Sequence, residues 1–416
     1  MSGIAGALLF GAAMTARADA SLEPGFIAWL GGVQDEALRR GISEQTWQAA
    51  LPSMRPIERV LELDQKQPEF VDTFWNYLDA RVNDQRIAAG GKLLHKHRKL
   101  LQKIETRYGV PARVLVAFWG LETHYGKMTG RIPITGALAT LAYDARRTRF
   151  FRNELLDALA ILQAGHVEPK TLLGSWAGAM GQVQFMPSTF NRYAVDADGD
   201  GRKDIWGSLD DAFASAANYL RQSGWQPGQS WGRPVQLPPD FDWQFARLDV
   251  KKPLSEWAAL GISQIDGAAL PDEPIKAALL LPQGHTGPAF LVYGNFEVML
   301  TWNRSVNYAL AVGHLADRLN GQPALSHGRD ADNRRLSREQ AIELQQRLVQ
   351  LGFNVGDSDG VLGSRTRAAI RAYQRSASLP ADGYPSLPLL QRLQATGTQS
   401  TSQAALSAPA ANPIVF

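Results

Sequence analysis

Apolar residues recur at helical spacing over most of the chain. Such segments run from Phe26 to Ala50, Pro68 to Arg107, Pro111 to Glu122, Phe150 to Ala164, Asp210 to Ser223 and Asn307 to Leu319. A recurrence every three to four positions places apolar side chains on one face of a helix. Alternation typical of strands is scarce, and its best examples lie between Pro234 and Val292. The pattern therefore predicts a mainly α body that carries a small β element.

A helix boundary is predicted at residues 108–111, which read Tyr-Gly-Val-Pro. Glycine is common just after a helix C-terminus, and proline is favoured in the first turn of the next helix. We therefore expect one helix to end near Tyr108. The next should begin at Pro111 and carry Glu122 near its end.

The C-terminal part of the chain has a different organisation. Residues 322–335 are polar, rich in turn formers and without periodicity, which predicts a linker. Residues 336–394 form a second compact unit, and residues 395–416 have the Ser, Thr, Gln, Ala and Pro bias of a disordered tail. The core face expected for the second unit consists of Ile342, Leu344, Leu348, Leu351, Ile370 and Tyr373.

Residues 1–20 have features of a signal peptide. An apolar run from Ile4 to Met14 precedes Ala18-Asp19-Ala20, which fits a small-residue cleavage site. No Lys or Arg precedes Ile4, so an irregular helical start is the alternative. The run is too short to span a bilayer, and no later segment approaches a membrane span. We expect export as a soluble periplasmic protein whose main body covers residues 21–321.

Composition narrows the classes of function. The chain has 416 residues, of which 45% are hydrophobic and 20% charged, as in a soluble protein of two or three folding units. The formal net charge of +3 and the lack of basic runs with interleaved aromatics argue against nucleic acid as a partner. The chain has no cysteine, which excludes disulfides, thiolate metal sites, cysteine nucleophiles and a lipidated N-terminal cysteine.

Candidate chemistry begins at residues 119–126, Trp-Gly-Leu-Glu-Thr-His-Tyr-Gly. Apolar and aromatic walls raise the pKa of a carboxyl group and keep it protonated as a general acid, a role open to Glu122. Taken alone, a solvated surface glutamate is the commoner explanation. Residues 175–190 change this balance, because they are dense in Gly, Met, Gln and small hydroxyl residues that suit a groove for a sugar chain.

These stretches resemble the lytic transglycosylase B family, glycoside hydrolase family 103. The family signature E-S/T-x-Y/W-G matches residues 122–126, and S-F/W-A-G-A-M-G-x-x-Q-F-M-P-S matches residues 175–188. Residues 295–297 and 303–312 match its closing segment. The resemblance covers roughly residues 26–319. It implies a lysozyme-like α+β catalytic domain that cleaves the MurNAc–GlcNAc β-1,4 bond without water.

The resemblance also implies site residues. Glu122 is the expected catalyst, and the expected substrate contacts are Ser175, Gln184, Tyr219, Trp302, Asn303 and Tyr308. Tyr219 and Tyr308 fit equally well as core residues of amphipathic helices. The family often has Tyr where this chain has Trp302, so stacking is expected there and a hydrogen bond is left open.

A single acid fits a substrate that supplies its own nucleophile. Ordinary glycosidases use two flanking carboxylates, and the two motifs contain no second one. Glu122 would protonate the leaving oxygen and then deprotonate the C6 hydroxyl, which gives a 1,6-anhydroMurNAc end. Two alternatives stay open: a hydrolytic muramidase that uses Glu122 and water, and a non-catalytic wall-binding scaffold.

Residues 196–204 resemble an EF-hand loop, with carboxylates at alternate positions and Gly201 at position six. Position twelve is Gly207 rather than a bidentate Glu, whereas the family's longer loop closes with an aspartate before the next helix. The ligands expected are Asp196, Asp198, Asp200, the backbone carbonyl of Arg202, and Asp211, with Asp210 as the less favoured closing aspartate. We expect a structural Ca²⁺ or other hard cation and no cofactor for catalysis. A solvated Asp/Gly-rich turn is the alternative.

Residues 348–374 resemble a three-helix peptidoglycan-binding domain. They contain L-x-x-L-G-F and then D-G-x-x-G-x-x-T, beginning at Leu348 and Asp359. The resemblance implies a small three-helix unit that targets the cell wall. The partner expected from both units is the peptidoglycan glycan strand, and the sequence identifies no other wall enzyme as a partner.

Overall fold

The computed structural model describes residues 22–65, 73–144, 148–329 and 334–395. The predicted signal peptide (residues 1–20) and all but residue 395 of the predicted disordered tail lie outside this part of the chain. The first half of the chain forms α1 (Pro24–Arg39), α2 (Glu44–Ala50), α3 (Glu58–Gln65), α4 (Phe74–Arg81), α5 (Asp84–Lys96), α6 (Arg98–Tyr108), α7 (Ala112–Thr123), α8 (Ile134–Tyr143) and α9 (Thr148–Gln163). The rest of the main body adds α10 (Pro187–Tyr193), α11 (Leu209–Gln222), α12 (Leu254–Ala259), α13 (Gly294–Trp302) and α14 (Val306–Leu319). The prediction of a mainly α fold is confirmed.

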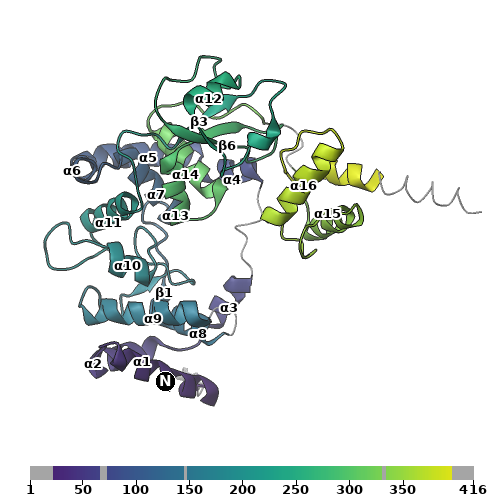
Figure 1. Ribbon diagram of the computed structural model, residues 1–416. Coiled ribbons are helices and arrows are strands. Elements are labelled where there is room, and N and C mark those ends of the chain that lie inside the picture. Colours follow the sequence, from purple (N-terminus) through teal and green to yellow (C-terminus); the bar gives the residue numbers. More distant parts are fainter. Residues whose placement is uncertain (1–21, 66–72, 145–147, 330–333, 396–416) are drawn as a thin grey trace, which may run out of the picture.

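Helix α7 lies at the centre of the largest hydrophobic core. All seven residues from Val114 to Gly120 are buried, and α5, α6, α11 and α14 pack against the helix. A helix that is apolar on every side is stable only when its neighbours enclose it. Figure 1 shows α7 and α14 side by side in the upper half of the body, below the β element. Because α7 carries Glu122 near its end, this core sets the position of the carboxylate.

The β element is a five-stranded antiparallel sheet in the order β4-β6-β7-β3-β5. Its strands are β3 (Gly232–Gln236), β4 (Lys251–Pro253), β5 (Ser263–Gln264), β6 (Lys276–Leu280) and β7 (Ala289–Val292). They lie in the region where strand-like alternation was expected. One face packs on a second hydrophobic cluster around Trp257 of α12. A separate pair, β1 (Ile132–Pro133) and β2 (Leu173–Gly174), joins the segment after the Glu122 signature to the one before Ser175.

The C-terminal unit has the predicted three helices. They are α15 (Arg338–Gln350), α16 (Ser364–Ser376) and a helical segment over residues 387–395, and they enclose a third hydrophobic cluster. Of the expected core face, Leu344, Leu348, Ile370 and Tyr373 are buried and Ile342 is half-buried. The expectation for Leu351 was wrong: this side chain is 38% exposed, because it follows the last turn of α15 as its C-cap.

Part of the predicted linker is held against the main body. Arg329 forms two hydrogen bonds to the Asp79 carboxylate, at 2.9 and 2.7 Å, and its guanidinium lies 4.1 Å from the centre of the Trp75 ring. Trp75 Nε1 donates to the carbonyl of Gly328 at 2.9 Å. The C-terminal unit also contacts the loop before β7, where Asp382 accepts a hydrogen bond from the backbone N–H of His285 at 2.8 Å. The two units therefore touch both through the linker and directly.

Candidate active site

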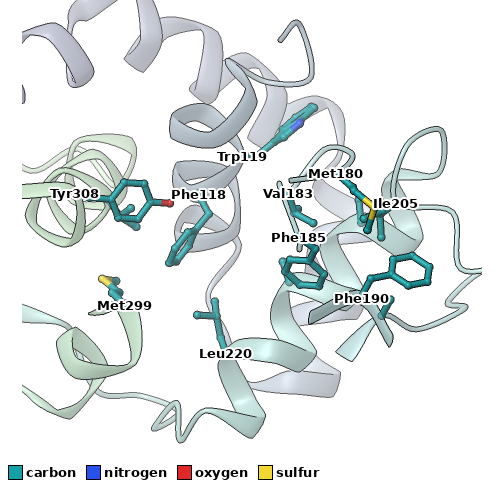
Figure 2. Packing of buried hydrophobic residues seen from close by; sticks show 14 of the residues in the cluster. Phe118, Trp119, Met180, Val183, Phe185, Phe190, Ile205, Leu220, Met299 and Tyr308 are labelled. Atoms are coloured by element: carbon teal, nitrogen blue, oxygen red, sulfur yellow. The ribbon is translucent and has the colours of Figure 1, made fainter. Parts of the chain in front are cut away.

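Glu122 lies in the last turn of α7, half-buried, and its carboxylate contacts the closing segment of the main body. Trp302 Nε1 donates to Glu122 Oε1 at 2.8 Å, and the Tyr308 hydroxyl donates to the same oxygen. Trp302 ends α13 and Tyr308 lies in the first turn of α14. Figure 2 shows Tyr308 with its hydroxyl oxygen turned toward the part of the cluster that holds Phe118. Two side chains from the closing segment, 180 and 186 positions after Glu122, thus donate to one carboxylate oxygen.

The signature residues after Glu122 reverse the chain direction against α7. His124 and Tyr125 adopt left-handed conformations, with φ values of 51° and 60°, and the N–H of His124 caps the helix at Trp119 O. The Tyr125 ring lies against Gly120, where a Cβ would meet it at 2.7 Å. Its hydroxyl donates to Arg86 O at 2.8 Å, and burial raises the pKa of Tyr125 to about 12. Gly120 and Tyr125 therefore fix where α7 ends.

Gln182 connects the second motif to the first. Its Oε1 accepts from Trp119 Nε1 at 2.8 Å, and its carbonyl oxygen accepts from Thr123 Oγ1 at 3.0 Å. A Cβ on Gly126 would lie 2.4 Å from Gln182 Oε1, so only glycine fits this approach. Gln182 and Thr123 were not predicted as site residues. Both residues lie inside the two sequence motifs, but the sequence does not show that the motifs contact each other through them.

Trp302 is enclosed by aromatic rings as well as bonded to Glu122. Its ring centre lies 4.5 Å from that of Phe118, 5.4 Å from Phe185 and 5.1 Å from Tyr219. These contacts hold the indole within the protein, and the stacking of Trp302 on a substrate stays a prediction. Tyr219 donates from its hydroxyl to Thr301 O at 2.9 Å, which steadies the backbone next to Trp302.

Three predicted substrate contacts form hydrogen bonds to the backbone, two of them within their own loops. Ser175 Oγ accepts from Ala179 N at 3.0 Å, and Asn303 Oδ1 accepts from Ser305 N at 3.0 Å. Gln184 has a positive φ of 51° and donates to the carbonyl oxygens of Thr129 and Gly181, at 3.2 and 2.9 Å. Their roles toward a substrate stay predictions.

His124 directly follows the Glu122-Thr pair, and its imidazole faces a cation. Its Nδ1 lies 3.1 Å from Arg86 Nη2. Burial, and then the charge of Arg86, lower the pKa of His124. Because a guanidinium only donates, the contact requires a neutral imidazole that accepts at Nδ1.

A buried glutamate near the second motif, Glu154, has a structural role. Glu154 of α9 is 4% exposed, and its carboxylate accepts from the Ser188 hydroxyl at 2.7 Å and from the Ser188 N–H at 2.9 Å. Burial raises the pKa of Glu154. These bonds satisfy the N-terminus of α10, which has no cap from its own N-cap residue. Glu154 therefore anchors the end of the motif.

The acidic loop brings three carboxylates together. Oxygen atoms of Asp196, Asp198 and Asp211 lie within 4.8 Å of one another, and Asp211 is fully buried at the start of α11. Burial first, and the nearby charge of Asp198 as a smaller cause, raise the pKa of Asp211. Asp200 instead accepts from the N–H of Arg202 at 2.8 Å. Oxygen ligands clustered in this way suit a hard cation such as Ca²⁺.

Comparison with known proteins assigns the chain. Residues 25–317 match the family model described as the transglycosylase SLT domain. The chain belongs to this family. Residues 337–393 match the model of a putative peptidoglycan-binding domain. Membrane-bound lytic murein transglycosylase B of Escherichia coli K12 is 31% identical over 298 residues, which are 67% of this chain and 78% of that protein.

Solved structures agree with this assignment. SltB3 from Pseudomonas aeruginosa, in complex with NAG-anhNAM-pentapeptide, is 46% identical with a TM-score of 0.86, over 89% of this chain and all of that one. Escherichia coli Slt35 in complex with calcium is 29% identical with a TM-score of 0.60, over 71% of this chain and 93% of that one. The family resemblance and the expected fold class are thus confirmed. Within the described residues, no helix has the length and apolar character needed to cross a membrane.

Proposed function

We propose that this chain is a lytic transglycosylase that cleaves the MurNAc–GlcNAc β-1,4 bond of peptidoglycan, with Glu122 as its acid and base. The observation that carries the proposal is the convergence of Trp302 and Tyr308 on Glu122 Oε1, at the meeting point of segments matched by the family model. A half-buried carboxylate oriented by donors from two aromatic side chains is prepared for proton transfer in a partly desolvated site. The complex of a relative with NAG-anhNAM-pentapeptide supports the reaction type.

In this mechanism the protein supplies one proton carrier and the substrate supplies the nucleophiles. Glu122 protonates the glycosidic oxygen while the N-acetyl carbonyl of MurNAc stabilises the positive charge at C1. Glu122 then takes the proton of the C6 hydroxyl, which attacks C1 and closes the 1,6-anhydro ring. Ser175, Gln184, Tyr219 and Asn303 are the further groove contacts that we propose.

Product mass separates this reaction from hydrolysis by a muramidase. An anhydro end is lighter by one water than a reducing end, so mass spectrometry of fragments from purified sacculi distinguishes the two. We expect Glu122→Gln to abolish release of anhydro fragments while sacculus binding is retained. Glu168→Gln, a change at an exposed glutamate, is the matched control and should leave release unchanged. Reducing MurNAc ends alone would contradict the transglycosylase assignment, and full turnover by E122Q would favour a different catalyst.

We further propose that the acidic loop holds a structural Ca²⁺. Asp196, Asp198 and Asp211 would supply carboxylate oxygens, with Asp200 and the carbonyl of Arg202 completing the site. A cation would offset the burial of the Asp211 charge and the nearby charge of Asp198. The calcium complex of a relative supports the choice of ion. Calcium should raise the thermal unfolding midpoint and a chelator should lower it. Asp198→Asn should remove both effects. A wild-type midpoint that is insensitive to calcium and chelator would argue for a loop that binds no cation.

The domain organisation that we propose has five parts. Residues 1–20 act as a signal peptide for export to the periplasm. Residues 21–321 form the catalytic domain, and residues 322–335 link it to the C-terminal unit. Residues 336–394 bind the wall, and residues 395–416 form a tail. The contacts of Arg329 and Asp382 with the main body indicate that the wall-binding unit is held in a set position relative to the active site. A chain ending at residue 335 should keep activity on soluble glycan fragments and lose affinity for sacculi.

A further inference from the structure

The indole of Trp302 makes an unusual contact for a residue expected to stack on sugar. Its N–H points at Glu122 Oε1, at 2.8 Å, and its ring is packed among Phe118, Phe185 and Tyr219. The side chain is only half-exposed. Its polar atom is therefore engaged with the catalyst, and much of its ring is covered by protein.

The two donors to Glu122 Oε1 differ in what they can do. An indole N–H donates and never accepts, whereas the Tyr308 hydroxyl can do either. If Glu122 carried its proton on Oε1, that proton could point to the Tyr308 oxygen and away from a substrate. The Trp302 N–H opposes that arrangement, because its bond is stronger to an unprotonated carboxyl oxygen than to a hydroxyl oxygen.

We propose that Trp302 is a positioning residue that keeps Oε1 of Glu122 as an acceptor and thereby assigns the transferred proton to Oε2. The inference rests on the proposed role of Glu122. In both half-reactions the same oxygen then exchanges the proton: Oε2 gives its proton to the glycosidic oxygen and later receives the proton of the C6 hydroxyl. No rotation of the carboxyl group is needed between the two steps.

A tyrosine at this position would not enforce the same choice. Its hydroxyl can accept as well as donate, so the proton of Glu122 could reside on either oxygen. The tryptophan of this chain therefore makes the orientation depend on one N–H. That N–H can be removed chemically without removing the ring.

The test replaces the indole N–H in the full-length protein. Trp302→Phe keeps an aromatic ring without the donor, and site-specific β-(3-benzothienyl)alanine keeps the shape of the indole with sulfur in place of N–H. We expect both to lower kcat about tenfold or more with little change in KM. Because a donor stabilises the carboxylate form, its loss should also move the alkaline limb of the pH profile of kcat/KM to higher pH.

Controls separate this role from a structural one. Trp257→Phe removes an indole N–H that donates to Ala277 O at 2.9 Å in the second hydrophobic cluster. It should lower the unfolding midpoint and leave the pH profile unchanged. Wild-type kcat and pH profile in the benzothienyl variant would overturn the inference while Glu122 keeps its role. Turnover by E122Q would instead overturn the proposed function. If W302F fails to fold, the isosteric benzothienyl variant still decides the question.

Discussion

Two adjacent glycines of α5 give opposite predictions for the same substitution. A Cβ at Gly90 would lie 2.5 Å from the Tyr125 hydroxyl oxygen and 2.8 Å from Cδ2 of Leu319. A Cβ at Gly91 would meet no atom within 4 Å. Both residues lie inside the helix, so alanine gains the same helix propensity at either position. The difference between the two variants therefore reports the packing of Tyr125 and Leu319 against α5.

The expected free energies follow from these contacts. Gly91→Ala should stabilise the protein by about 0.5–1 kcal/mol through helix propensity. Gly90→Ala gains the same amount but displaces Tyr125, whose hydroxyl donates to Arg86 O in a buried setting. Losing that bond costs about 1–3 kcal/mol, which leaves a net destabilisation of up to about 2.5 kcal/mol. Because Tyr125 sets the turn after Glu122, G90A should also lower turnover.

Urea unfolding and release of anhydro fragments, measured side by side on both variants, check the prediction. The double variant G90A/Y125F should be less destabilised than the sum of the single changes, because Phe removes the oxygen that the new methyl group meets. Equal shifts of the unfolding free energy in G90A and G91A would refute the reasoning. So would wild-type turnover in a clearly destabilised G90A.

Three further outcomes are expected. Burial raises the pKa of Asp317, which accepts from Trp231 Nε1, to about 6 from 3.8. The unfolded chain releases this proton at lower pH, so the free energy of unfolding falls as pH rises from about 4 to 6. Above this range Asp317→Asn should gain stability relative to the wild type, by at most ~3 kcal/mol before solvent screening reduces it. Urea unfolding of both proteins at pH 4 and above pH 6 measures this difference. Glu154→Ala should lower the free energy of unfolding by about 1–2 kcal/mol, because α10 loses its cap, and should also lower turnover. Urea unfolding and an assay of released anhydro fragments measure the two effects. Arg329→Met should change stability by less than about 1 kcal/mol, since its ion pair is exposed, yet should speed proteolysis of the linker.

Local signals located most helices but not all of them. Gly109 is the left-handed C-cap of α6, with a φ of 73°, and α7 begins directly after Pro111, as their residue types predicted. Helix α8 was not predicted, because every residue from Ile134 to Ala142 is buried and no polar face marks a period. The single helical region expected up to Arg107 is instead divided, and the side chain of Asn83 caps the start of α5.

The sequence predicted the motifs of the candidate site but not the hydrogen bonds between them. Glu122 stood out through the sequence around it, as did the cluster of Asp196 and Asp198. The bond from Trp302 to Glu122 depends on how α13 meets α7, a contact between segments 180 positions apart. Gln182 illustrates the same limit, since it lies in a turn and its partners Trp119 and Thr123 lie on α7. Spacing along the chain reports helix faces, whereas these bonds depend on tertiary packing.

The geometry around Glu122 explains how one carboxyl group can take two roles. A group that is acid in one step and base in the next must present its reacting oxygen in the same place both times. With donors from α13 and α14 on one oxygen, rotation of the carboxyl group would break both bonds at once. Phe118 restricts the same region from the α7 side through its contact with Trp302. A fixed carboxylate of this kind needs no second acid to exchange roles with, provided that the substrate carries its own nucleophile.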